Sequence, residues 1–136
     1  MDPTLNKPEV EPLGLRIAVF EDDPIDRRDL LSNLDWKGHH VVGIATNVTE
    51  AQELIPGLGE LGVQVAIVDG NLTPWNKHGE EGRQIIEQIK ELFPEIVTIG
   101  WGGLSLSVSD YDIGKGVGPG PYLATLDSIL EKINRV

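Results

Sequence analysis

The chain has 136 residues, of which 40% are hydrophobic, and this suits one globular domain with a single core. Its 22 acidic and 11 basic residues give a net charge of −11, which repels the phosphate backbone of nucleic acids. The absence of cysteine excludes disulfides, thiol catalysis and cysteine metal sites. No apolar run approaches the ~20 residues that cross a bilayer, and because the N-terminal residues lack an apolar stretch we expect no secretory signal. We therefore expect a cytoplasmic protein that neither binds nucleic acid nor inserts into membranes.

Short apolar runs alternate with amphipathic segments along most of the chain. Residues 1–14 contain prolines and no periodicity, which predicts a flexible tail before a domain over residues 15–136. Hydrophobic periodicity and turn residues place the other elements. Strands are predicted at residues 15–20, 40–45, 63–68, 96–99 and, less regularly, 111–114. Helices are predicted from Pro24 to the Lys37-Gly38 break and at residues 49–55, 82–93 and 122–134.

Alternating strands and helices predict an α/β fold, a doubly wound parallel five-stranded sheet. In such sheets functional groups gather at the carboxyl ends of the strands. Glu21, Asp22 and Asp23 follow the first predicted strand and Asp69 follows the third. These two strands are neighbours in the flavodoxin-like order 2-1-3-4-5, so the carboxylates meet in one patch. Crowded carboxylates repel one another, and a bound divalent cation would relieve this repulsion.

Each of these acids also has a purely structural explanation. Asp23 fits the N-cap of the helix that begins at Pro24, and Asp69 fits a turn before glycine. Acidic pairs after a strand, such as Glu21 and Asp22, are common in loops. The convergence of all of them in one fold favours a functional site over separate structural roles.

Histidines offer no competing metal site. His39, His40 and His78 lack the spacing of a zinc motif. His39 and His40 stand at the start of a predicted strand, and we expect both on the surface.

Three segments of the chain follow a recognisable pattern: IAVFEDDPIDRRDLL, GHHVVGIATNVTEAQELI and VQVAIVDGNLTP. They resemble the first, second and third strands, with their flanking residues, of the receiver domains of two-component response regulators, the CheY-like family. The resemblance covers most of residues 15–99 and weakens beyond, so the chain is atypical in its C-terminal third. The order and spacing of the segments are more specific than any one of them.

The resemblance implies a Mg²⁺-dependent phosphorylation site. Asp69 would be the phosphoacceptor, and Asp22 would bind Mg²⁺ directly. Glu21 would act through water or as an alternative ligand, and the backbone carbonyl of Asn71 would complete the protein ligands. Lys115 would pair with the acceptor carboxylate and then with the phosphoryl group.

The C-terminal third departs from the family pattern at the positions that normally respond to phosphate. Gly100 stands where the family has a serine or threonine, and Thr98 takes that place only if the alignment slips by two residues. Trp101 replaces a normally small residue. Asp112 stands at the position of the switch aromatic, and Gly116 replaces a proline.

Two loops also differ in length from the family pattern. The glycine that opens the third helix is best matched by Gly82, which implies an insertion around residues 75–79. Conversely, residues 100–115 are too few for a full fourth helix and a strand, so we expect that helix to be shortened or missing.

The first functional hypothesis is a single-domain receiver that is not an enzyme beyond its own phosphorylation and dephosphorylation. A histidine kinase or phosphotransfer protein would phosphorylate it, and it would act on a downstream protein target by direct contact. The alternative is a pseudo-receiver, an interaction module that works without phosphorylation. A metal-dependent phosphatase fits less well, because no further general acid accompanies the carboxylates.

Overall fold

The computed structural model describes residues 14–70, 72, 80–102 and 108–134, and the elements follow one another in the predicted order. Most of the predicted tail and the predicted insertion at residues 75–79 lie outside these ranges. The strands are β1 (Arg16–Phe20), β2 (His40–Ala45), β3 (Val65–Asp69), β4 (Val97–Trp101) and β5 (Tyr111–Ile113). The helices are α1 (Pro24–Trp36), α2 (Val48–Leu54), α3 (Glu80–Leu92) and α4 (Gly120–Asn134). Two 3-10 turns, η3 (Ile55–Gly57) and η4 (Lys115–Val117), complete the described elements.

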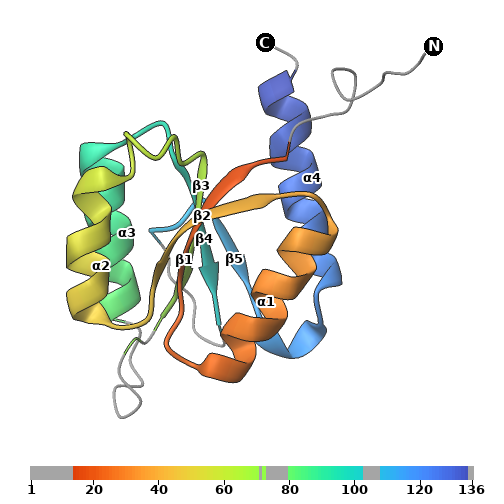
Figure 1. The fold of residues 1–136 in the computed structure, drawn as a ribbon, viewed down its shortest axis with the longest axis horizontal. Helices are drawn as coiled ribbons and strands as arrows, with labels where there is room; N and C mark the ends of the chain where they lie inside the picture. The colour runs from red at the N-terminus through yellow and green to blue at the C-terminus, as the bar shows by residue number, and fades with distance from the viewer. Residues whose placement is uncertain (1–13, 71, 73–79, 103–107, 135–136) are drawn as a thin grey trace.

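All five strands are parallel and lie in the order β2-β1-β3-β4-β5, which confirms the predicted fold class. Helices α2 and α3 cover one face of the sheet, and α1 and α4 cover the other (Figure 1). Successive residues of a strand point to opposite faces, so Ala18 and Phe20 join one core cluster while Ile17 and Val19 join the other. Burial on both faces explains why the strands read as continuous apolar runs.

The N-cap of α1 lies where the sequence predicts it. The Asp23 carboxylate accepts a hydrogen bond from the Ile25 N–H at 3.2 Å, and Pro24 follows as the first helical residue. The Asn47 side chain caps α2 by accepting from the Glu50 N–H at 2.8 Å. These caps fix the direction in which α1 and α2 leave the carboxyl edge of the sheet.

The connection between β4 and β5 is short, as predicted. It comprises residues 102–110, and the part of it that the structure describes contains no helix. Within the described residues, the prediction of a shortened or missing fourth helix is therefore confirmed. Among the described helices, none combines the length and the apolar character needed to span a membrane.

One surface prediction is wrong. His39 is only 5% exposed, because its Nδ1 accepts the Leu15 N–H at 3.0 Å and this bond holds the ring beneath the start of β1. Burial lowers the pKa of His39, which keeps the imidazole neutral and able to accept. His40 is exposed, as expected.

Candidate functional site

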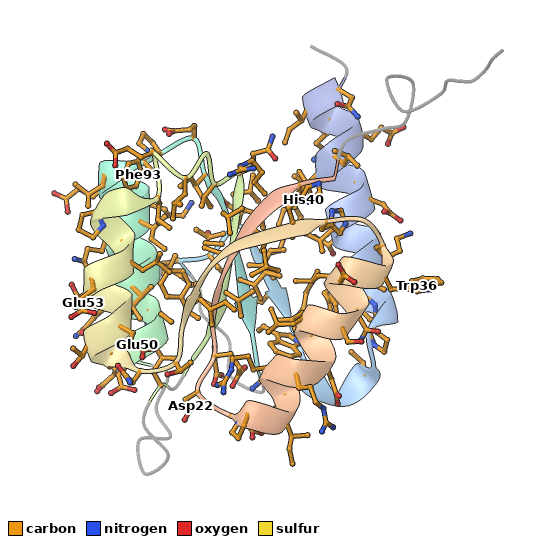
Figure 2. All side chains as sticks on the ribbon, in the orientation of Figure 1. Asp22, Trp36, His40, Glu50, Glu53 and Phe93 are labelled. Atoms are coloured by element: carbon orange, nitrogen blue, oxygen red, sulfur yellow. The ribbon has the colours of Figure 1, made fainter. Side chains whose placement is uncertain are left out.

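Three carboxylates meet at the carboxyl edge of the sheet. Each of Glu21, Asp22 and Asp69 places one oxygen within 4.8 Å of the others. The register explains this convergence, because β1 and β3 pair up to Phe20 and Val68, the residues just before Glu21 and Asp69. Glu21 is fully buried, Asp69 is 7% exposed and Asp22 is half-buried. Figure 2 shows Asp22 where β1 passes into α1.

Backbone contacts hold the β1–α1 turn in place. Arg27 Nη1 donates to the carbonyl oxygens of Glu21 at 3.0 Å and of Asp22 at 3.2 Å. Glu21 Oε2 accepts the Asp23 N–H at 3.0 Å, and the Glu21 N–H donates to the Ala45 carbonyl at 3.0 Å. The turn that carries the two acids is therefore fixed before any ligand arrives.

Lys115 adds a positive charge to this cluster. It is the first residue of η4, directly after Gly114 and β5, and its Nζ lies 2.8 Å from Glu21 Oε1. The same amine lies 3.0 Å from Asp26 Oδ2 and 3.6 Å from Asp69 Oδ2. The structure thus brings together Lys115 and three of the four candidate metal ligands, while Asn71 lies outside the described residues.

The electrostatics favour a further cation. Burial, together with the neighbouring Asp69 charge, raises the pKa of Glu21 to about 8, although Lys115 opposes the shift. Burial alone would lower the pKa of Lys115, but its contacts with Glu21 and Asp69 raise it above its ordinary value. Near neutral pH the cluster therefore holds a proton that a divalent cation would displace.

The donor set fits Mg²⁺. The three converging side chains offer only carboxylate oxygens, which are the ligands Mg²⁺ prefers in proteins. A half-buried Asp22 leaves part of the site open to the waters that this ion retains.

Two glycines let the backbone approach the Asp69 side. A Cβ on Gly82 would lie 2.5 Å from the Asp69 carbonyl oxygen and 2.7 Å from the Gly70 Cα. The Gly82 N–H donates to the Gly70 carbonyl at 2.9 Å, so α3 packs directly on the end of β3. A Cβ on Gly102 would lie 3.3 Å from Asp69 Oδ1. Side chains at either position would crowd the Asp69 carboxylate or the end of β3.

Within the described part of the chain, the neighbouring ends of β4 and β5 add no further carboxylate to the cluster at the ends of β1 and β3. Gly100 pairs with Asp112 in the register of β4 and β5, and Asp112 is exposed. The alternative alignment through Thr98 is wrong, because Thr98 pairs with Ala66 whereas Asp69 pairs with Trp101.

The Thr98 hydroxyl has another role, which lies away from the carboxylate cluster. Thr98 Oγ1 and Thr98 N both donate to Asp110 Oδ2, at 3.2 Å and 2.8 Å. Lys90 binds the other Asp110 oxygen at 2.8 Å. The hydroxyl therefore ties β4 to the segment before β5.

Of the two further residues that contact Lys115, sequence reasoning missed Asp26 and singled out Trp101 without predicting its contact with the lysine. Asp26 lies in the first turn of α1, where an acid is already explained by the helix dipole. Trp101 is 6% exposed and its ring centroid lies 4.8 Å from Lys115 Nζ. The only available signal was the replacement of a small residue by tryptophan beside the acceptor.

Comparison with known proteins places the fold. No protein-family model and no curated protein matches the chain. Solved structures, in contrast, do match the chain. A CheY-like response regulator receiver domain protein from Methanospirillum hungatei is 22% identical with a TM-score of 0.71, over 90% of this chain and 98% of the other. A LuxR-family two-component response regulator from Aurantimonas is 18% identical, with a TM-score of 0.72 and coverage of 88% and 86%.

A third similar structure is the isolated receiver domain of RcsB from Salmonella enterica, determined in the presence of the phosphomimetic BeF₃⁻. It is 25% identical with a TM-score of 0.66, over 85% of this chain and 89% of that domain. The resemblance predicted from the sequence is thus confirmed at the level of structure: the chain has the fold of a CheY-like response-regulator receiver domain.

Proposed function

We propose that this chain is a response-regulator receiver that accepts a phosphoryl group on Asp69. The observation that carries the proposal is the convergence of Glu21, Asp22 and Asp69 within 4.8 Å of one another, with the Lys115 amine beside them. A nucleophilic carboxylate, a cation site and a fixed positive charge are the parts that phosphoryl transfer requires.

The phosphodonor would be a phosphohistidine of a histidine kinase or phosphotransfer protein. An Asp69 carboxylate oxygen bonds to phosphorus as the phosphorus–nitrogen bond breaks, and the imidazole leaves with the electron pair and takes up a proton. Glu21, Asp22 and Asp69, together with the Asn71 carbonyl, would hold Mg²⁺. When bound, Mg²⁺ offsets negative charge on the phosphoryl oxygens. Lys115 is placed to offset the same charge from the β5 side.

The chain would then signal by contact with a downstream protein and would turn over no substrate of its own beyond the phosphoryl group. The receiver fold supports a signalling role of this kind.

A pseudo-receiver is the second candidate, and the β4–β5 pairing favours it. Gly100 has no hydroxyl to contact a phosphoryl group, and its partner Asp112 is no aromatic switch. Such a module would bind its partner without phosphorylation.

Mass spectrometry with Mg²⁺ and acetyl phosphate separates the two candidates. We expect one phosphate on the wild-type protein, no phosphate on Asp69→Asn, and an unchanged adduct on Asp112→Asn, a matched loss of one acid on β5. A wild-type protein that gains no phosphate would reject the receiver and favour the pseudo-receiver.

A further inference from the structure

Lys115 is held by an acid that the phosphoryl-transfer site does not require. We propose that Asp26 is a positioning residue that restrains Lys115 and thereby slows phosphoryl transfer to Asp69. This inference rests on the proposed function, since it concerns the rate of the same reaction.

The distances show where the amine is held. Lys115 Nζ lies 2.8 Å from Glu21 and 3.0 Å from Asp26, but 3.6 Å from Asp69. The contact with Asp26 is a hydrogen bond as well as an ion pair. The acceptor carboxylate is therefore the most distant of the three acids around the amine.

Trp101 limits the movement of Lys115 on another side. The amine lies 4.8 Å from the ring centroid, within the range of a cation–π interaction. The ring is itself fixed, because it packs edge-on against Tyr122 at 5.7 Å, and the Tyr122 hydroxyl accepts from Asn33 of α1 at 2.9 Å. The lysine is thus held between α1, β4 and η4.

The pair with Asp26 is the contact that can open. A cavity of about 340 Å³ lies beside it, lined among others by Asp26, Lys115, Trp101 and Tyr122. The Asp26 side chain is 37% exposed, whereas Glu21 is fully buried. Water can therefore replace the lysine at Asp26 more readily than at Glu21.

Transfer brings negative phosphoryl oxygens to Asp69, and because Lys115 Nζ lies 3.6 Å from Asp69, a closer approach to these oxygens would lengthen its 3.0 Å contact with Asp26. If the ion pair between Lys115 and Asp26 is weaker in the transition state than in the ground state, the lost interaction energy raises the activation free energy of phosphoryl transfer. For a partly exposed ion pair this corresponds to a rate reduced by roughly two- to fivefold.

The test is the rate of adduct formation in Asp26→Asn, with acetyl phosphate and Mg²⁺ as in the mass-spectrometric experiment. Asp29→Asn is the matched control, because Asp29 lines the same cavity from the same helix and its charged partner is Arg28. We expect Asp26→Asn to react roughly two to five times faster than wild type and Asp29→Asn to react at the wild-type rate.

A Lys115→Met background separates restraint of the lysine from simple charge removal. We expect the gain from Asp26→Asn to vanish in that background. Nitrogen-15 NMR of the lysine side chains gives a second readout without phosphorylation: the Lys115 Nζ signal should shift in Asp26→Asn and stay in place in Asp29→Asn.

The outcomes distinguish this inference from the proposed function. A wild-type protein that forms no adduct overturns both. A wild-type adduct without a faster Asp26→Asn reaction, or with the same gain in the Lys115→Met background, overturns the restraint alone. A Lys115 Nζ signal that does not shift in Asp26→Asn also overturns the restraint.

Discussion

The ends of β1 and β3 and the ends of β4 and β5 lie at the same edge of one sheet, yet they carry different side chains. At β1 and β3, Glu21, Asp22 and Asp69 converge within 4.8 Å. At β4 and β5, Gly100 faces Asp112 across the register and offers no side chain to a phosphoryl group. The first pair of ends carries the carboxylates that we propose as the phosphoacceptor site, whereas the second has no hydroxyl at Gly100 and no aromatic ring at Asp112.

The two regions meet at Lys115. It follows β5 in the chain but contacts acids from the β1–α1 turn and from β3. The fold therefore keeps the proposed phosphoacceptor site while the strands beside that site depart from the family pattern. We therefore expect the structural changes caused by phosphorylation to stay close to Asp69.

The largest effect on stability should come from Gly82→Ala. The new Cβ would collide with the Asp69 carbonyl oxygen and Gly70 Cα, and such overpacking costs about 2 kcal/mol. Gly116→Ala, beside β5, meets nothing within 4 Å and should change stability by less than about 0.5 kcal/mol. Urea denaturation of both variants measures the difference, and equal stabilities would deny the close packing of α3 on β3.

Loss of Asp22 should weaken Mg²⁺ binding. Without one of the three converging carboxylates, Asp22→Ala should bind Mg²⁺ at least about tenfold more weakly in calorimetric titration. Asp112→Ala removes an acid from β5 and serves as the control, with an expected affinity equal to that of wild type. If Asp22→Ala keeps its affinity, the cation site is assigned to the wrong residues.

Mg²⁺ affinity should also rise with pH. The pKa of Glu21 is raised to about 8, so below this value the metal-free protein holds a proton that Mg²⁺ must displace. The affinity should therefore be about fivefold weaker at pH 7 than at pH 8, and Glu21→Gln should lose this dependence. Titrations at both pH values, in buffers of different ionisation heat, also count the released proton. A wild-type Mg²⁺ affinity that does not change with pH would contradict the raised pKa of the buried Glu21 carboxyl.

Thr98→Val should produce the smallest effect, a loss of stability without a change in phosphorylation. It removes the hydroxyl contact with Asp110 but leaves the backbone N–H and Lys90 on that carboxylate, at a cost of roughly 0.5–1 kcal/mol. Phosphate uptake on Asp69 should be unchanged, because Thr98 pairs with Ala66, away from the acceptor. If Thr98→Val takes up phosphate more slowly, the Thr98 hydroxyl contributes to the site at Asp69, and the separation between the β1–β3 ends and the β4–β5 region is wrong.

The sequence sufficed for the sheet order and for the meeting of the carboxylates. The apolar runs are continuous because both faces of the sheet are covered, and the acids follow the strands directly. Topology alone then brings Glu21 and Asp69 together.

Side-chain partners that depend on packing between distant segments could not be predicted. Asp26 contacts Lys115 across 89 positions of sequence, and an acid in a first helical turn needs no such explanation. His39 is buried because of a backbone N–H at Leu15, for which the sequence has no signal. Thr98 was open to two alignments until the register paired it with Ala66.

The most direct test of a local response is a map of amide chemical shifts on adding Mg²⁺ and beryllofluoride. We expect large changes at residues 21–23, at Asp69 and Gly70, and at Trp101 and Gly102. We expect small changes in β5 (Tyr111–Ile113) and along α4 beyond its first turn, because Gly100 and Asp112 cannot relay the new charge. Large shifts through β5 and the length of α4, with little change at Trp101, would contradict this account.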